Sequence, residues 1–234
     1  VTGINGFVGQ NLKTYLSKDF DVIGISRKEK KNELTYAIFL KENKSYGAMV
    51  HLAGKAHDLK KISNDKDYYE VNFELTKQLF DQFLQSDAQK FIYISSVKAV
   101  ADTVVGSLTE DVTPNPVTVY GKSKRMAEDY ILANLPSTKK VYILRPCMIY
   151  GLGNKGNLNL LFSLVSKGFP WPLGAFENQR SFCSIENLCF VIRELLTQER
   201  IPSGVYNVAD DETLSTNELI QLIAVSQNKK ARIL

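Results

Sequence analysis

Short runs of hydrophobic residues alternate with longer segments of helical spacing along the first part of the chain. The runs are too short for helices and are bounded by polar or small residues, so they predict buried β-strands. They cover residues 21–26, 48–54, 91–94 and 141–144. Between the second and third runs, apolar residues from Val71 to Phe83 repeat every four positions, which predicts a helix over residues 69–83.

This alternation of strands and helices predicts the fold class. Strands separated by helices form a parallel sheet with crossover helices, so we expect an α/β, doubly wound, Rossmann-like sheet. Ligands of such sheets bind beyond the carboxyl ends of the strands. Candidate chemistry should therefore gather where the predicted strands end.

The pattern is weaker in two other parts of the chain. Residues 29–46 suggest only a short strand at 35–39, and beyond residue 151 glycines and prolines interrupt short helical pieces. Ser215 followed by Glu218 fits a capping box that opens a last helix. We predict a dinucleotide-binding domain at residues 1–151 and a smaller, incomplete substrate-binding lobe at 152–234.

Both ends of the sequence suggest a fragment of a longer protein. Val1 stands directly before Thr2 and Gly3, without the strand expected before such a turn. The last residues stop without a closing element. We therefore expect truncation at both ends.

Composition narrows the function classes. The 234 residues are 44% hydrophobic and 23% charged, with a net charge of +4 and scattered basic residues, which argues against nucleic acid as a partner. No apolar run approaches a membrane span and no signal peptide is present, so no membrane partner is expected. The three cysteines lack CxxC spacing, which indicates a reducing, cytoplasmic setting and no metal site.

The first residues form a glycine loop with Gly-x-x-Gly-x-x-Gly spacing, from Gly3 through Gly6 to Gly9, at the start of a helix. Glycines let the backbone turn tightly, and the N–H groups of a helix start hold a pyrophosphate. The loop therefore indicates a dinucleotide cofactor, with a purely structural turn as the alternative. Arg27 ends the following strand, where a basic residue favours NADP over NAD unless it only faces solvent.

Tyr120 and Lys124 stand four residues apart at the head of a helical segment, and so lie on one helical face. An ammonium beside a phenol lowers its pKa and suits it to exchange a proton with a sugar oxygen. The spacing alone is common and fits an exposed helix start equally well. The glycine loop, Gly54 and Ser96 all fall at the same sheet edge, which favours a site.

Several motifs, in this order and spacing, resemble those of the extended short-chain dehydrogenase/reductases, specifically the NAD-dependent epimerase/dehydratase family that acts on nucleotide sugars. The motifs are Thr2-Gly3-x-x-Gly6-Phe7-x-Gly9, His51-Leu52-Ala53-Gly54, Val71-Asn72, Ile94-Ser95-Ser96, Tyr120-x-x-x-Lys124, Leu144-Arg145-Pro146, Tyr150-Gly151, Arg180-Ser181-Phe182 and Tyr206-Asn207-Val208. They span nearly the whole chain.

The resemblance assigns roles by position. It implies that Tyr120 is the acid/base, that Lys124 lowers its pKa and holds the nicotinamide ribose, and that Ser96 binds the reacting oxygen. Arg180 and Asn157 would contact the nucleotide diphosphate; an exposed lobe residue is the alternative for each. The implied cofactor site comprises Gly3, Asn5, Gly6, Phe7, Val8, Gly9, Arg27, Leu52, Ala53, Gly54, Tyr120, Lys124 and Pro146.

The chain departs from the pattern of the family in three places. Val97 and Lys98 replace the Asp-Glu pair of the 4,6-dehydratases, which makes dehydration an unsuitable reaction. The Asp-Leu that contacts adenine is not visible between Tyr36 and Lys41, and Met148 replaces an Asn of many UDP-galactose epimerases.

The resemblance leaves three functions open. The first is an NAD(P)-dependent nucleotide-sugar epimerase acting at C4 of a UDP-hexose, similar to UDP-glucose 4-epimerase. The second is an NADPH-dependent UDP-4-keto-sugar reductase, which Arg27 favours. The third is a non-catalytic dinucleotide-binding regulator, against which an intact set of Ser96, Tyr120 and Lys124 argues. The resemblance also allows a homodimer.

Overall fold

The computed structural model describes residues 1–28, 33–41, 45–56, 64–154 and 157–234. Its residues form two compact units, one of residues 1–146 and 188–208, the other of residues 147–187 and 209–234. The first contains α1 (Phe7–Leu16), β1 (Gly24–Ser26), β2 (Glu33–Thr35), α2 (Tyr36–Lys41), β3 (Ala48–His51), α3 (Asp65–Tyr69), η1 (Glu70–Glu74), α4 (Leu75–Gln85), β4 (Lys90–Ile94), η2 (Val97–Ala99), α5 (Val119–Ala133), β5 (Lys140–Pro146), most of α7 (Ile185–Thr197) and β8 (Gly204–Val208).

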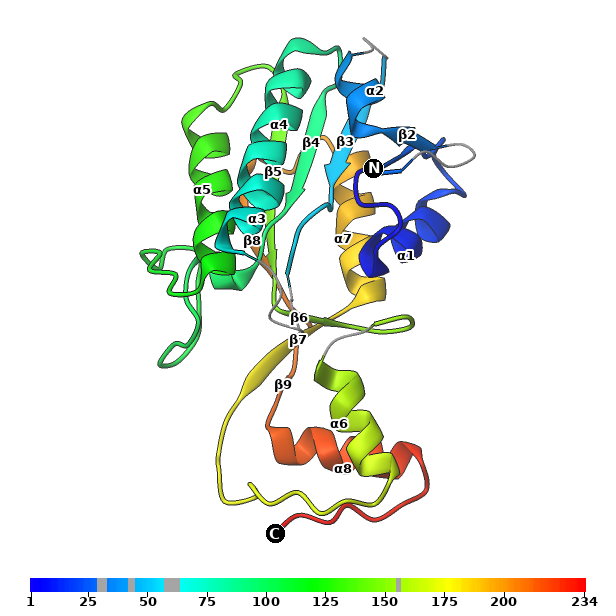
Figure 1. The fold of residues 1–234 in the computed structure, drawn as a ribbon, viewed down its shortest axis with the longest axis vertical. Helices are drawn as coiled ribbons and strands as arrows, with labels where there is room; N and C mark the ends of the chain where they lie inside the picture. The colour runs from blue at the N-terminus through cyan, green and yellow to red at the C-terminus, as the bar shows by residue number, and fades with distance from the viewer. Residues whose placement is uncertain (29–32, 42–44, 57–63, 155–156) are drawn as a thin grey trace. The chain divides into compact units, whose positions relative to one another are not determined.

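The first unit is built on a parallel sheet. β3, β4, β5 and β8 pair in that order, and β1 pairs with β2 (Figure 1). Thr2 joins these two parts, because it forms bridges to Ile25 of β1 and to His51 of β3. The start of the chain thus occupies the centre of the sheet. The resulting order is that of a Rossmann fold, so the predicted fold class is confirmed.

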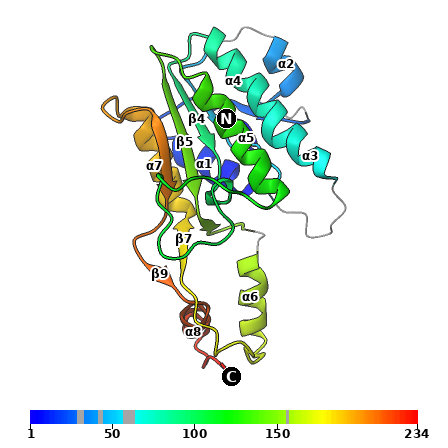
Figure 2. The same ribbon diagram turned by 90° about the vertical axis from the view of Figure 1, so that its left-hand side faces the viewer.

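Helices cover both faces of this sheet: α4 and α5 lie on one side, α1 and α7 on the other (Figures 1 and 2). Alternate residues of a strand face the same side, and on the α4–α5 side Phe91 and Val141 pack against Phe80 and Ile131. These four side chains are almost fully buried. Burial of this apolar surface holds α5, and with it the candidate site, against the ends of the strands.

Two sequence predictions in this unit need correction. The strand predicted at residues 35–39 is wrong: β2 ends at Thr35 and α2 begins at Tyr36. Helical spacing lets Tyr36, Phe39 and Leu40 all pack on the core, which a strand could not do. The helix predicted at 69–83 is longer, and its middle turn, η1, is a π-turn.

The second unit contains β6 (Met148–Tyr150), α6 (Asn157–Ser166), β7 (Arg180–Ser184), β9 (Thr213–Leu214) and α8 (Thr216–Ser226). β7 pairs with both β6 and β9, and α6 packs with α8 around Val165, Ile220 and Ala224. The capping box predicted at Ser215 and Glu218 is confirmed. β8 returns to pair with β5, so the first unit includes residues 188–208 as well as residues 1–146.

Among the described residues, no helix is long and apolar enough to cross a membrane. The same residues contain no group of three or more His, Cys, Asp or Glu side chains that could hold a metal ion.

Candidate active site

Ser96 and Tyr120 meet beyond the carboxyl end of β4. Ser96 caps the short turn η2, and its hydroxyl accepts a hydrogen bond from the Lys98 N–H at 3.2 Å. Tyr120 lies in the first turn of α5, whose N-cap Thr118 accepts from the Gly121 N–H at 3.2 Å. The Ser96 hydroxyl lies close enough to the Tyr120 phenol to act on its pKa. A serine and a tyrosine far apart in sequence thus form a pair.

The pKa of the Tyr120 phenol lies above its usual value of 10.0, because burial disfavours the phenolate. The nearby Ser96 hydroxyl acts in the opposite direction. The expected lowering by Lys124 is not what the structure shows, since the Lys124 ammonium donates instead to the Ile94 carbonyl at 2.8 Å. The Tyr120 phenol is therefore protonated at neutral pH.

Lys124 lies one helical turn beyond Tyr120 and is almost completely buried. Its ammonium also lies 4.7 Å from the centre of the Tyr93 ring. Burial lowers its pKa from 10.5 to about 8, and the nearby Glu128 acts in the opposite direction. A Cβ added to Gly54 would lie 3.0 Å from the Lys124 Nζ, so the loop after β3 passes directly beside this ammonium.

Asn72 connects this loop to α5. It is fully buried within the π-turn η1, and its amide pairs with the backbone of Lys55: the Lys55 N–H donates to Oδ1 at 2.7 Å, and Nδ2 donates to the Lys55 carbonyl at 3.0 Å. Nδ2 also donates to the Ser123 hydroxyl at 2.9 Å. π-Turns occur often at functional sites. This one fixes the Gly54 loop relative to the Tyr120 turn.

A second set of contacts fixes the start of α5. The Asp102 carboxylate accepts from the N–H groups of Val117 and Thr118, and from the Lys98 ammonium at 2.8 Å. Its pKa is lowered by these hydrogen bonds, against the effect of burial. A Cβ at Gly121 would lie 2.3 Å from the Lys98 carbonyl, so only glycine permits this approach of α5 to the Ser96 turn.

The glycine loop has the form that a pyrophosphate site requires. Gly3 has a φ of +66°, and a Cβ there would lie 2.8 Å from the Ala53 nitrogen. Gly6 is the N-cap of α1 and makes no side-chain cap, so the first N–H groups of that helix, from Phe7 onward, are open to an anion. The described residues of this loop fit a dinucleotide.

A buried hydrogen-bond chain holds the loop in place. His51 contacts the Thr2 hydroxyl through Nδ1 at 2.6 Å and the Thr76 hydroxyl through Nε2 at 2.8 Å. Thr76 donates to the Asn72 carbonyl and Thr2 accepts from the Ala53 N–H, so the proton of His51 belongs on Nε2. Burial, Lys124 and the N-terminus lower the pKa of His51 to about 3, so it stays neutral.

The remaining predicted cofactor residues of the first unit lie at the strand ends. Arg27 is exposed directly after β1, and Leu52 follows β3. Pro146 is the last residue of β5, in register with Val208 of β8. The Asn5 amide, in the glycine loop, donates to Glu33 at 2.7 Å.

The predicted diphosphate contacts belong to the second unit. Arg180 is exposed at the start of β7, where it pairs in register with Leu214. Asn157 is the first residue of α6, and its side chain lies outside the described residues. Met148 is the first residue of β6, paired with Phe182. Arg180 therefore remains available to a ligand.

The sequence pattern of the NAD-dependent epimerase/dehydratase family matches residues 1–209. The chain belongs to this family. It is therefore an enzyme of an NAD-dependent family, and its relatives include nucleotide-sugar epimerases and reductases.

Two relatives illustrate the similarity. UDP-glucose 4-epimerase of Vibrio cholerae is 34% identical over 98% of this chain and 75% of the relative. An undecaprenol-linked N-acetylglucosaminyl diphosphate 4-epimerase of Escherichia coli O157:H7 is 27% identical over 97% of this chain and 72% of the relative.

Solved structures share the fold. UDP-N-acetylglucosamine 4-epimerase of Bacillus cereus superposes with a TM-score of 0.83 over 100% of this chain and 85% of that chain, at 22% identity. UDP-glucose 4-epimerase of Thermus thermophilus, in complex with NAD, gives a TM-score of 0.80 over 100% and 84%, at 20% identity.

Sequence reasoning about this family member missed two residues that support the site, Asn72 and Glu128. Asn72 stood within a matching motif but had no assigned role, because its partners lie 17 and 51 positions away. Glu128 continues the four-residue spacing of Tyr120 and Lys124. A carboxylate on the buried face of that helix was a signal that a cation must approach from another element.

Proposed function

We propose that the protein is a nucleotide-sugar epimerase that acts at C4 of a UDP-hexose with NAD or NADP. The observation that carries this proposal is the gathering of Ser96, Tyr120 and Lys124 beyond the end of one strand. The 34% identity to the UDP-glucose 4-epimerase of Vibrio cholerae supports the choice of substrate and of carbon.

The cofactor residues divide between two ends of the dinucleotide. The open N–H groups of α1 would hold the pyrophosphate, and Gly54 and Lys124 would lie beside the nicotinamide ribose. The bound nicotinamide supplies the acceptor and donor of hydride. A Cβ at position 54 would lie 3.0 Å from the Lys124 Nζ, so a larger residue would require the ammonium to shift.

In this proposal the chain itself moves one proton. During oxidation, Tyr120 in its deprotonated form takes the proton of the C4 hydroxyl as the carbonyl forms. The Ser96 hydroxyl hydrogen-bonds the C4 oxygen. After the 4-keto sugar has turned, the Tyr120 phenol returns the proton to that oxygen. The raised pKa of Tyr120 suits this second half, in which it acts as an acid.

The nucleotide diphosphate would bind to the second unit. Arg180 offers an exposed guanidinium, which forms two-pronged hydrogen bonds with phosphate oxygens. We assign Asn157 as the second diphosphate contact. Neither residue takes part in the proton transfer.

A second candidate is an NADPH-dependent 4-keto-sugar reductase, which needs only the second half of the reaction. Arg27 at the end of β1 favours it, because a cation there suits the 2′-phosphate of NADP. A relative named GDP-6-deoxy-D-mannose reductase, from Pseudomonas aeruginosa, is 24% identical over 96% of this chain. Dehydration suits the site less well, because Val97 and Lys98 stand where the 4,6-dehydratases have their Asp-Glu pair. Lys98 forms an ion pair with Asp102 instead. A non-catalytic regulator has no need of the complete set of three side chains.

The test is to incubate the purified protein with UDP-hexoses and to identify any nucleotide released on denaturation. Tightly held NAD together with interconversion of two UDP-hexoses would support an epimerase. Exchangeable NADPH together with consumption of a UDP-4-keto sugar would identify a reductase instead. Turnover of neither substrate would refute both proposals.

A further inference from the structure

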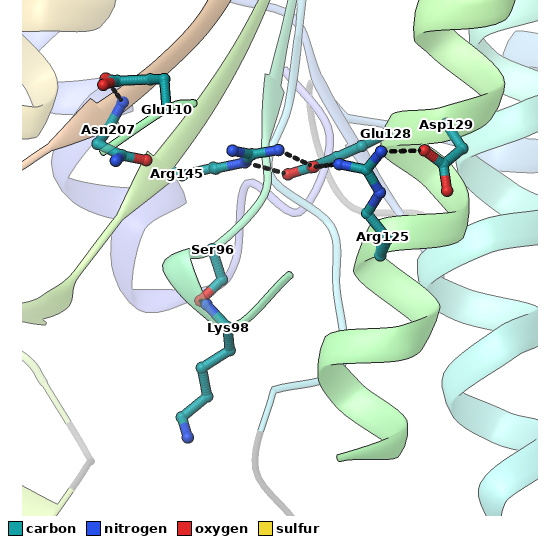
Figure 3. A network of polar contacts seen from close by, with 8 residues as sticks. All are labelled: Ser96, Lys98, Glu110, Arg125, Glu128, Asp129, Arg145 and Asn207. Atoms are coloured by element: carbon teal, nitrogen blue, oxygen red, sulfur yellow. Dashed lines mark hydrogen bonds and ion pairs between the residues drawn. The ribbon is translucent and has the colours of Figure 1, made fainter. Parts of the chain in front are cut away.

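A buried ion pair lies on the same face of α5 as Tyr120 and Lys124, one turn farther along the helix. Glu128 accepts two hydrogen bonds from Arg145, from Nε at 2.9 Å and from a terminal nitrogen at 2.6 Å (Figure 3). Glu128 is fully buried and Arg145 is 2% exposed. A bidentate pair of this kind fixes both distance and orientation.

The pair joins α5 to the end of β5. Arg145 is the last residue but one of β5 and pairs in register with Asn207 of β8. Asn207 in turn holds the segment that precedes α5. Its N–H donates to Glu110 at 2.7 Å (Figure 3). Its side-chain amide donates to the Leu108 carbonyl at 2.9 Å. The helix that carries Tyr120 is thus anchored to the sheet by charge as well as by apolar packing.

Burying these ions has a cost that helix anchoring alone does not explain. Desolvation of an ion pair commonly offsets its attraction, and an apolar pair of the same shape often holds a helix as well. A buried carboxylate does, however, provide what an apolar pair cannot, a negative charge close to Lys124. Glu128 follows Lys124 by four residues, so the two side chains are neighbours on one helical face.

We propose that Glu128, held in place by Arg145, is a positioning residue that serves as the counter-ion of the buried Lys124 ammonium. This inference rests on the proposed function, because Glu128 acts through the role that the proposed function gives to Lys124. Glu128 does not touch the substrate or the cofactor in this proposal. It keeps the ammonium charged, and therefore able to hold a ribose.

The other titratable groups around Lys124 do not serve as its counter-ion. Tyr93 of β4 lies beneath the ammonium, and burial and the charge of Glu128 keep the pKa of its phenol well above the usual value. His51 of β3 is neutral, as its pKa of about 3 requires. Tyr120 on the same helix has a raised pKa. Among the groups that act on Lys124, Glu128 is the one that raises its pKa from the low value set by burial.

The experiment compares Glu128→Gln with a matched control, Asp129→Asn. Asp129 is the next residue of α5, carries the same charge, and forms an ion pair with Arg125 on the exposed side of the helix. The readout is the pH titration of the Lys124 ¹³Cε resonance in selectively labelled protein, assigned with Lys124→Arg. Loss of a neighbouring negative charge lowers the pKa of a lysine by about one unit or more. We expect that shift in Glu128→Gln and no shift in Asp129→Asn.

A double variant, Glu128→Gln with Arg145→Met, separates the electrostatic role from a structural one. Glu128→Gln leaves Arg145 buried without its carboxylate and will unfold at lower denaturant concentration than the unmodified protein. The double variant removes both charges and should recover most of that resistance, while its Lys124 pKa should lie between the values of Glu128→Gln and the unmodified protein, because the positive charge of Arg145 is removed as well.

An unchanged Lys124 titration in Glu128→Gln would overturn the proposal. So would an equal fall of the Lys124 pKa in Asp129→Asn, since the effect would then not depend on the buried position of Glu128. The titration needs neither substrate nor turnover. A protein that proved inactive on UDP-hexoses would therefore refute the proposed function and still give a result on Glu128.

Discussion

The two compact units bury different kinds of side chain. The first encloses Lys124, Glu128, Arg145 and His51, four ionisable groups that are almost or completely inaccessible to water. The described core of the second unit centres on the apolar Val165, Ile220 and Ala224. The ligand-binding candidate of the second unit, Arg180, is exposed.

The difference suggests that the first unit carries the chemical step and the second unit binds the substrate. Buried charged groups need fixed partners, so their geometry is set before any ligand arrives. An exposed guanidinium gains its partner only when a diphosphate binds. Changes in the first unit should therefore reduce the rate of the chemical step or the stability of the fold, whereas changes at Arg180 should reduce affinity for the substrate.

The largest effect is expected from Tyr120→Phe, which removes the proton donor. We expect kcat to fall by about 10²–10⁴-fold with cofactor binding near normal, because the phenol acts only on the substrate. Tyr130→Phe is the matched control: it removes a phenol from the same helix, one that contacts Asp81 and not Ser96. Steady-state kinetics and cofactor titration of both variants provide the measurement. Full activity of Tyr120→Phe would refute the assignment of the acid/base.

Next in size is the loss of stability in Arg145→Met. It leaves the buried Glu128 carboxylate with Arg125 as its remaining ion-pair partner, at 3.5 Å, and should lower the free energy of unfolding by about 3–5 kcal/mol. Arg193→Met breaks ion pairs with Asp19 and Glu194 at the surface, and should cost no more than about 1 kcal/mol. Urea denaturation compares them. Equal losses would show that burial does not distinguish these two arginines.

The sequence predicted the framework of the first unit because its strands are continuous apolar runs, such as residues 91–94. It also predicted that Ser96, Gly54 and Tyr120 lie at one edge, since parallel strands end together. It failed at residues 35–39, where a short apolar segment fits a strand or a helix equally well.

The charge environment of the site could not be predicted in the same way. The pairing of Glu128 with Arg145 joins a helix to a strand, and the opposing effects on the pKa of Tyr120 arise from burial in the folded chain. The spacing of residues along the chain predicts neither this ion pair nor the pKa of Tyr120. For the same reason, the role of Asn72 became visible only with its contacts to Lys55 and Ser123.

A smaller effect is expected in the second unit from Arg180→Ala. Loss of a charged hydrogen bond to phosphate should raise KM for the nucleotide sugar by about 10–100-fold with little change in kcat. Arg232→Ala provides the control, since Arg232 is an exposed arginine of the same unit whose guanidinium contacts the Gly168 carbonyl. A fall in kcat with unchanged KM would instead place Arg180 in the chemical step and remove the proposed division of labour.

The smallest effect is expected from Arg27→Ala. It should weaken NADP binding by about tenfold and leave NAD binding nearly unchanged, because the guanidinium would contact only the additional phosphate. Lys28→Ala, at the adjacent exposed position, serves as the control. Fluorescence titration with both reduced cofactors gives the ratio. Equal weakening for the two cofactors would remove the reason to favour NADP.

A UDP-hexose deuterated at C4 gives the most direct test of whether hydride leaves and returns at a sugar carbon. If the nicotinamide takes and returns the hydride, the epimeric product seen by NMR keeps deuterium at C4, because the hydride never exchanges with water. Product that carries hydrogen from solvent at C4 would show that the carbon loses a proton instead. That result would contradict the mechanism assigned to Ser96, Tyr120 and Lys124.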